Sequence, residues 1–341
     1  MRRYRATQAT IIFHDCGGDM TIVDISDPTD RPLPLGWEFA RRAEAAGFDG
    51  VGRADHQDSG RDVFMELGVA ARHTTRVALF PCVSNVLSRH PSVLASIVNS
   101  LDELSSGRAR LVLGAGDTAA RVMGRPPAGV DVLRDGVVAI RALLRGDAAR
   151  FGHGADVRLR HVPAKPPKVI VKASSPRMLE LAGEVADGAF CMVGIAPAMV
   201  DEARRAIARG AARAGRDPAG VRFMLGVPVF VDSNEERARL RARRILGVWL
   251  GKPSRIFGRQ AAAMGIPLPE APGEAAIPES VLERLCDAMG LVGTPWRCAE
   301  RLARCVAETG AAHVVCQLYG AAEQADEVLE AFERHILKAM K

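Results

Sequence analysis

The chain of 341 residues lacks any apolar run long enough to cross a bilayer. It opens with Arg2, Arg3 and Arg5 in place of the apolar segment that a secretory signal needs. The seven cysteines are odd in number, and neither a Cys-x-x-Cys nor a His-x-x-x-His spacing occurs, so neither a disulfide framework nor a metal site is indicated. These absences predict a reduced, cytoplasmic protein that has no membrane contact and no bound metal.

Lysine is scarce, because it accounts for only six of the 46 basic residues. Arginine is scattered among Ala and Glu, and the blocks Arg204–Arg216 and Arg237–Arg244 are typical of solvated helix faces. The net charge of +6 therefore gives little support for nucleic acid as a partner.

Three familiar nucleotide-binding and catalytic motifs are also missing. The sequence contains no P-loop and no nucleophile elbow. Gly114-Ala115-Gly116 does not complete a Rossmann fingerprint, since the third glycine and the later acidic residue are absent at the required spacing.

The dominant pattern is an alternation of short apolar runs with stretches of helical periodicity. Each run carries turn or polar residues at its carboxyl end, and eight of them occur. They are Ala9–Phe13, Gly50–Gly52, Arg76–Cys82, Arg108–Leu113, Lys168–Lys172, Gly188–Val193, Val221–Val231 and Ala312–Leu318. This alternation predicts an α/β protein with a (β/α)8 TIM barrel, whose active site lies at the carboxyl ends of the strands.

Helices are expected between these runs, with glycine after their ends and proline at several of their starts. The expected segments are Leu35–Ala46, Asp62–Arg72, Pro91–Leu104, Val132–Leu144, a helix from Pro176, Met199–Ala214, Glu235–Val248 and Trp296–Thr309. A further C-terminal helix, Ala322–Met340, is expected outside the barrel.

The whole chain, 1–341, is expected to form a single domain with two insertions, at about 145–167 and 249–292. Gly, Pro and Ala dominate Ala261–Pro278 in the second insertion, which we expect to carry small helices over the barrel mouth. Outer helices rich in Ala and Leu favour a homodimer.

Asp55 and His56 follow the second strand and offer an imidazole with a carboxylate beside it, a combination suited to proton transfer. A loop-capping pair is the alternative explanation. His14 follows the first predicted strand and would face the same cavity, where it is a candidate substrate contact.

The fourth strand ends in Gly114, Gly116, Asp117 and Thr118. Glycines at this point allow a flat ring or a phosphate to approach the backbone, and the carboxylate could bind substrate or exchange a proton. An ordinary turn after the strand would also explain the two glycines.

Two further strand ends carry polar residues that could bind a heterocycle. Ser174 and Ser175 precede Pro176 at a predicted helix start, where free N–H groups and hydroxyls suit an anion; a simple N-cap is equally compatible. The third strand leads into Cys82, Val83, Ser84 and Asn85, which could hydrogen-bond a ring edge. Met192, near the end of the sixth strand, is a further candidate contact of the heterocycle.

In their order along the chain, these motifs resemble the bacterial luciferase-like superfamily, and within it the branch that uses the deazaflavin F420. The residues that carry the likeness are Ala43-Glu44-Ala45-Ala46-Gly47-Phe48-Asp49, Asp55-His56, Val83-Ser84-Asn85, Arg89-His90-Pro91, Gly107-Arg108, Gly114-Ala115-Gly116-Asp117, Met178-Leu179-Glu180-Leu181-Ala182-Gly183, Ala186-Asp187-Gly188 and Gly293-Thr294-Pro295. The likeness covers nearly the whole chain except the two insertions.

The resemblance implies a flavin or deazaflavin at the carboxyl ends of the strands, with a non-prolyl cis peptide between Cys82 and Val83 behind its ring. It places the cofactor phosphate at Ser174 and Ser175, where relatives commonly have a glycine pair. It also implies that His56 transfers a proton, that Asp55 orients this imidazole or the ring, and that Asp117 faces substrate.

The Gly-Asp-Thr ending is more similar to F420-dependent reductases of the methylenetetrahydromethanopterin type than to the flavin monooxygenases. The leading hypothesis is hydride transfer between deazaflavin C5 and an imine, activated alkene or carbonyl of a small molecule. The alternatives are an FMNH2-dependent monooxygenase and a flavin-binding protein without catalysis.

Overall fold

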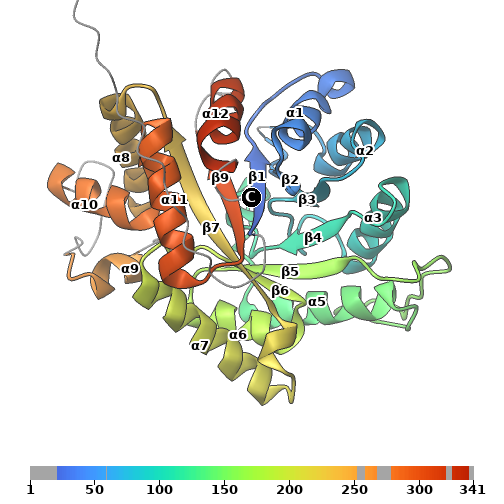
Figure 1. Ribbon diagram of the computed structural model, residues 1–341. Helices are drawn as coiled ribbons and strands as arrows, with labels where there is room; N and C mark the ends of the chain where they lie inside the picture. The colour runs from blue at the N-terminus through green and yellow to red at the C-terminus, as the bar shows by residue number, and fades with distance from the viewer. Residues whose placement is uncertain (1–20, 59, 252–257, 267–277, 320–324, 338–341) are drawn as a thin grey trace, which may run out of the picture.

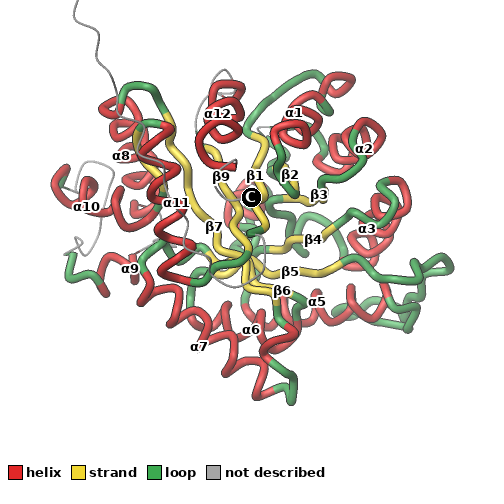
Figure 2. Tube along the Cα trace, in the orientation of Figure 1, coloured by secondary structure: helices red, strands yellow, loops and turns green. Residues whose placement is uncertain are grey.

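The structure, a computed structural model, describes residues 21–58, 60–251, 258–266, 278–319 and 325–337. Parallel strands form its centre and helices surround them (Figures 1 and 2). The barrel strands are β1 (Ile22–Asp27), β2 (Gly50–Arg53), β3 (Ala78–Pro81), β4 (Arg110–Leu113), β5 (Lys168–Ala173), β6 (Gly188–Cys191), β7 (Arg222–Val231) and β9 (His313–Leu318). Neighbouring strands follow the order β3-β2-β1-β9-β7-β6-β5-β4, and the predicted eight-stranded TIM barrel is confirmed.

The barrel closes between β3 and β4, the two ends of this order. Leu79 N donates to Arg108 O at 3.0 Å, and Ser84 N donates to Val112 O at 3.0 Å. A third bond, from Gly114 N to Ser84 O at 2.9 Å, continues the seam beyond the ends of both strands. The seam therefore joins the segment after β3 to the glycine-containing end of β4.

The first strand of the barrel differs from the prediction. Ile22–Asp27 takes the place between β2 and β9, with Asp24 opposite Gly50 and Ile22 opposite His313. The segment Ala9–Phe13, which we expected there, and His14 both lie outside the described residues. Three of the six residues of Ile22–Asp27 are polar (Asp24, Ser26 and Asp27), so this strand does not appear in the sequence as an apolar run.

Most predicted helices are confirmed with small shifts at their ends. They are α1 (Glu38–Ala46), α2 (Val63–His73), α3 (Pro91–Leu104), α5 (Val130–Leu144), α6 (Pro176–Val185), α7 (Pro197–Arg213), α8 (Glu235–Gly251) and α11 (Pro295–Thr309). Local chemistry sets several ends: the Asp62 carboxylate caps α2 by accepting from Phe64 N and Met65 N, and Gly47 ends α1 with φ 104°. No helix in these described ranges is long and apolar enough to cross a membrane.

The C-terminal helix α12 (Ala325–Phe332) lies between α11 and α1 and completes the ring of outer helices (Figure 1). Phe332 packs against Phe48 at a ring-centroid distance of 5.9 Å. Helix α8, which we expected in that ring, instead packs on the end of β7 and on α10 (Glu279–Met289). Helices α8 and α12 are both amphipathic, so periodicity alone could not show which of them belongs to the ring around the barrel.

The segment 249–292, which we expected to be an insertion, contains short helices and a strand where it is described. Helix α10 packs against α8, and α9 (Gly258–Ala263) lies at the lower left of Figure 1. The short strand β8 (Leu291–Gly293) extends the sheet along the end of β7. The first insertion, at 145–167, contains one bridge between Ala149 and Val157.

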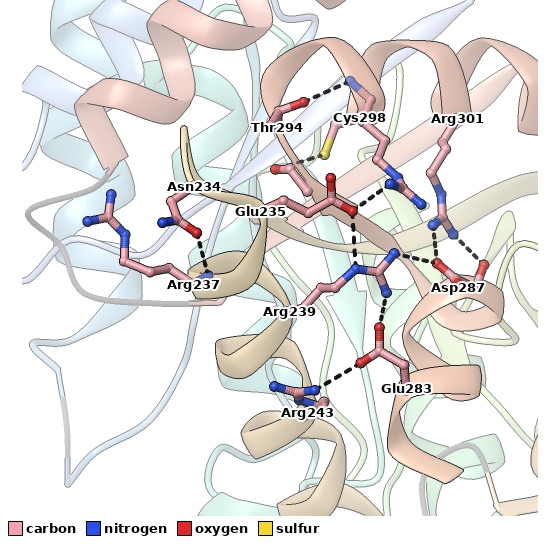
Figure 3. Close-up of polar contacts among 12 residues, drawn as sticks. Asn234, Glu235, Arg237, Arg239, Arg243, Glu283, Asp287, Thr294, Cys298 and Arg301 are labelled. Atoms are coloured by element: carbon pink, nitrogen blue, oxygen red, sulfur yellow. Dashed lines mark hydrogen bonds and ion pairs between the residues drawn. The ribbon is translucent and has the colours of Figure 1, made fainter. Parts of the chain in front are cut away.

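Charged side chains tie α8 to α10 and α11, as Figure 3 shows. Arg239 on α8 forms ion pairs with Glu235, Glu283 and Asp287, and Asp287 also contacts Arg301 on α11 at 2.7 Å. Because these residues come from three helices, the ion pairs fix the amino-terminal half of α8 against the insertion.

The barrel interior is packed by large apolar side chains opposite glycines. An added Cβ at Gly52 would lie 2.6 Å from Phe80 Cε2, and one at Gly226 would lie 2.5 Å from Phe190 Cε2. Large side chains that lie opposite glycines fill the interior of a small barrel without voids. On the outside, buried aliphatic residues of the strands pack against the helices and form the larger core.

Helices α6 and α7 pack closely through facing glycines, which gives a test of this packing. An added Cβ at Gly210 would lie only 1.8 Å from Glu180 O, so we expect Gly210→Ala to lower the free energy of unfolding by about 1–3 kcal/mol. Urea denaturation followed by circular dichroism measures the change.

The matched control is Gly68→Ala in α2, where the added Cβ would lie 3.7 Å from Leu104 Cδ2, an ordinary contact. Alanine favours helix by ~1 kcal/mol over glycine, so this variant should be neutral or more stable. Equal effects at both positions would contradict the packing described.

Candidate active site

A cavity of about 550 Å³ opens at the carboxyl ends of the barrel strands. Strands β1, β5 and β9 line it, together with the segments that follow β2, β3, β4 and β6 and with α4 (Asp117–Val122), α6 and α8. Its lining residues are Ser26, Asp27, Pro28, Ala54, Asp55, His56, Cys82, Val83, Asn85, Gly114, Ala115, Gly116, Asp117, Thr118, Ala119, Lys172, Ser174, Met178, Met192, Trp249, Gln317, Leu318 and Tyr319.

Most of the site residues expected from the sequence meet in this one cavity. Those that line it are Asp55, His56, Cys82, Val83, Asn85, Gly114, Gly116, Asp117, Thr118, Ser174 and Met192. Ser84 lies behind the wall, fully buried, and Ser175 is the half-buried residue before α6. His14 lies outside the described residues.

Asp55 is held by the segment that follows β3. Its Oδ2 accepts a hydrogen bond from Ser84 Oγ at 2.7 Å and another from the Arg89 guanidinium. The second guanidinium nitrogen of Arg89 donates to Asp62 at 2.6 Å. Within the described residues no hydrogen bond joins Asp55 to His56, so the adjacent pair expected from the sequence does not form, and Asp55 positions the backbone after β3.

Cys82 and Val83 are joined by a cis peptide bond, as the resemblance implied. Val83 faces Gly114 across the barrel seam, where an added Cβ at Gly114 would come within 2.9 Å of Val83 Cγ2. Gly116 has φ 78° and lies so close to Asn85 that an added Cβ would be 2.8 Å from Asn85 Cγ. The missing side chains of the two glycines thus make room for Val83 and Asn85, which line the cavity beside them.

Asp117 and Thr118 begin a short helix, α4 (Asp117–Val122), that the sequence analysis did not predict. The Asp117 carboxylate accepts from Arg121 at 2.8 Å, one turn later. Gln57, just beyond His56, donates to Ala119 O at 3.0 Å and joins the end of β2 to this helix. Asp117 is therefore a partly neutralised carboxylate at the rim of the cavity.

Ser174 and Ser175 lie at the start of α6, with Pro176 as its first residue. The Ser175 side chain makes no capping hydrogen bond. The first N–H groups of α6 therefore receive no hydrogen bond from the Ser175 side chain, and a helix start of this kind suits an anion such as a phosphate.

A buried charged cluster supports the rim between β1 and β2. Arg53 contacts Asp27 at 2.7 Å and donates two hydrogen bonds, at 2.6 and 2.7 Å, to Glu66 on α2. Burial raises the pKa of Asp27, although Arg53 and the hydrogen bonds from Thr29 act in the opposite direction. The cluster fixes the backbone that carries His56 into the cavity.

Several lining residues were missed by the sequence analysis. Asp27 was missed because the first strand was misplaced. Gln317 and Tyr319 lie in and just after the last strand, outside the motifs described above. Lys172 lies within β5 and faces inward, whereas those motifs follow the strands. Trp249 lies within the predicted second insertion and stands edge-on to Tyr319, with centroids 4.7 Å apart.

Cys82 gives a direct test of the cavity. Burial raises the pKa of its thiol above the ordinary value of 9.0, while Lys172 acts in the opposite direction. We expect iodoacetamide to label Cys82 slowly at pH 7 and about tenfold faster for each pH unit up to its pKa, because only the thiolate reacts. Mass spectrometry of peptides from the folded protein measures the rate.

A ligand that fills the cavity should protect Cys82, whereas the fully buried Cys191 and Cys316 should stay unlabelled throughout and serve as internal controls. Rapid labelling of Cys82 at pH 7 would show that its environment differs from the one described here.

Comparison with known proteins agrees with this geometry. The profile of the family described as "Luciferase-like monooxygenase" matches residues 26–313. The chain belongs to this luciferase-like family. Its membership confirms the resemblance that the sequence motifs indicated, and the relatives support assignment to the oxidoreductases.

Two curated relatives and one solved structure illustrate the likeness. A 5,10-methylenetetrahydromethanopterin reductase of Methanolobus tindarius is 31% identical over 81% of this chain and 87% of its own length. An F420-dependent glucose-6-phosphate dehydrogenase of Beutenbergia cavernae is 32% identical over 60% of this chain and 66% of its own. The coenzyme F420 dependent tetrahydromethanopterin reductase of Methanopyrus kandleri superposes with a TM-score of 0.72, 20% identity and coverage of 95% and 100%.

Proposed function

We propose that this protein is an F420-dependent oxidoreductase acting on a small organic substrate. The observation that carries the proposal is the single cavity in which Val83, Gly114, His56 and Ser174 meet. Sequence relatives add support, because those named above include an F420-dependent dehydrogenase and reductases of the methanopterin type.

The cavity fits a deazaflavin in its chemistry and its size. The part of the cavity lined by Val83, Gly114 and Gly116 would hold the ring, and the start of α6 at Ser174 would hold the phosphate. A volume of about 550 Å³ lies within the ~300–1,000 Å³ range of ligand pockets. When bound, the deazaflavin would exchange a hydride at C5 with an imine, activated alkene or carbonyl carbon.

His56 is the residue proposed to move a proton during this reaction. It lies at the end of β2, lines the cavity and is half-buried, so its imidazole can reach a ligand while remaining accessible to solvent protons. Asp117 also lines the cavity and would contact the substrate. Asp55 acts through the backbone, because its carboxylate is bound by Ser84 and Arg89.

An FMNH2-dependent monooxygenase is the second candidate, and the description of the matched family profile favours it. Such an enzyme needs reduced flavin from a separate reductase. A third candidate is a protein that binds a flavin-type ligand without turning it over.

Titration of the purified protein with F420 and, separately, with FMN distinguishes the first two candidates. We expect F420 fluorescence to be quenched with a dissociation constant at least tenfold lower than that for FMN. Tighter binding of FMN would favour the monooxygenase. Binding of F420 without transfer of deuterium from deuterated cofactor to any tested imine, alkene or ketone would favour the non-catalytic candidate.

Substitution of His56 tests the proposed proton transfer. We expect His56→Ala to lower kcat by about 10²–10⁴-fold, the usual contribution of a general acid or base, while the F420 dissociation constant changes less than about threefold. Steady-state kinetics and fluorescence titration measure the two quantities.

His161→Ala, at an exposed histidine outside the cavity, is the matched control and should leave both quantities unchanged. Wild-type kcat in His56→Ala would remove this residue from the mechanism.

A further inference from the structure

The amino-terminal ends of the barrel strands surround a second cavity, of about 1010 Å³, which we call the amino-terminal hollow. Six strands contribute their first residues to it, namely Ile22, Ala78, Arg110, Lys168, Arg222 and His313. The candidate active site lies at the carboxyl ends of the same strands and shares no lining residue with the hollow. A ligand bound here would therefore be separate from the proposed chemistry.

The lining of the amino-terminal hollow is strongly basic. Seven cationic side chains line it, those of Arg76, Arg108, Arg110, Lys165, Lys168, Arg204 and Arg222, against the three carboxylates of Asp49, Asp102 and Asp187. Each of these carboxylates accepts a backbone N–H, from Val23, Ala109 and Val169 respectively. The surplus of four positive charges is large beside the net charge of +6 on the whole chain, so the excess charge is concentrated at this one place.

The first residues of three strands are cations whose side chains face the barrel axis. They are Arg110 of β4, Lys168 of β5 and Arg222 of β7. Side chains two residues apart on a strand lie on the same face of the sheet. The residues two places later are Val112, Ile170 and Met224, and all three are packed in the barrel interior. Arg110 confirms this direction, because its Nη1 reaches across the barrel to Asp24 Oδ2 on β1 at 2.6 Å.

Only one carboxylate, Asp24, belongs to this inward-facing layer. It is fully buried and lies 2.7 Å from His313 Nε2 as well as beside Arg110. Burial alone would raise the pKa of Asp24, but Arg110 and His313 hold it below the ordinary value, so its negative charge is already balanced. The side chains of Lys168 and Arg222 form no hydrogen bond and no ion pair within the described ranges of the chain.

The other strands add little bulk to this layer. Strands β2, β3 and β6 begin with Gly50, Ala78 and Gly188. In a TIM barrel the inward-facing layers are ordinarily filled by branched apolar side chains. Here the first layer instead consists of small residues and long cations, which leaves the hollow open to solvent at the amino-terminal end of the barrel.

Lys168 and Arg222 approach the hollow from two sides. Strand β6 lies between β5 and β7, so the backbones that carry the two cations are about 10 Å apart, or two strand spacings. An ammonium and a guanidinium are the groups with which proteins bind phosphate, through charge-assisted hydrogen bonds. Two such cations at this separation suit an anion that carries charge at more than one centre.

We propose that the amino-terminal hollow binds an anion with two or more phosphate groups, held between Lys168 and Arg222. Lys165, which is exposed and lines the same hollow, adds a third cation without a partner among the described residues. The bound anion links β5 to β7 and stabilises the folded barrel, because it binds the folded chain alone. This site does not depend on the function proposed above.

The experiment titrates inorganic triphosphate and, separately, orthophosphate into the purified protein by calorimetry at constant ionic strength. We expect triphosphate to bind at least tenfold more tightly than orthophosphate. Lys168→Met and Arg222→Met should each weaken triphosphate binding at least tenfold, because each removes one charged donor. Triphosphate should leave the rate of Cys82 labelling by iodoacetamide unchanged, since Cys82 lines the other cavity.

The matched control is Arg244→Met, at an exposed arginine of α8 outside the hollow, which removes the same charge and should retain wild-type affinity. Equal binding of the two probes by the wild-type protein overturns the proposal. Equal weakening by Arg244→Met also overturns it, because the effect would then reflect net charge alone. Protection of Cys82 by triphosphate would place the anion in the candidate active site and overturn it as well. The wild-type comparisons decide the question even if a variant does not fold, and none of these results bears on the proposed function.

Discussion

The structure depends on the seam that closes the barrel between β3 and β4, and Ser84 is its central residue. Its N–H donates to Val112 O, its carbonyl accepts from Gly114 N, and its hydroxyl donates to Asp55. One residue thus joins the two edge strands and also holds the backbone that follows the Cys82–Val83 bond. The wall of the cavity cannot shift without opening the barrel, so the hydrogen bonds that close the barrel also fix the shape of the site.

The architecture could be read from the sequence because periodicity is a local property. Buried parallel strands appear as short apolar runs, and ring helices as amphipathic stretches, so α3 was predicted to the residue. The first strand could not be identified in this way. Ile22–Asp27 carries Asp24, Ser26 and Asp27 and is less apolar than Ala9–Phe13, and only its pairing with β2 and with the distant β9 identifies it as a strand.

The site residues that follow strands could be predicted from the sequence, whereas those that lie inside strands could not. The carboxyl ends of parallel strands share one rim, which is why Asp55, His56, Gly114 and Ser174 meet. Consecutive residues leaving a strand point in different directions, so adjacency of Asp55 and His56 did not imply that they pair. Whether Lys172 faces the cavity depends on how the strands tilt around the barrel, which local sequence does not encode.

The ion pairs among α8, α10 and α11 have a consequence for how this scaffold could change its substrate. They clamp one half of α8, while the other half carries Trp249 to the wall of the cavity beside Tyr319. A change in the length of the segment that carries α10, or in the charges that pair with α8, would therefore shift the end of α8 that bears Trp249. Such changes would reshape the entrance of the cavity during evolution and leave the barrel strands unaltered.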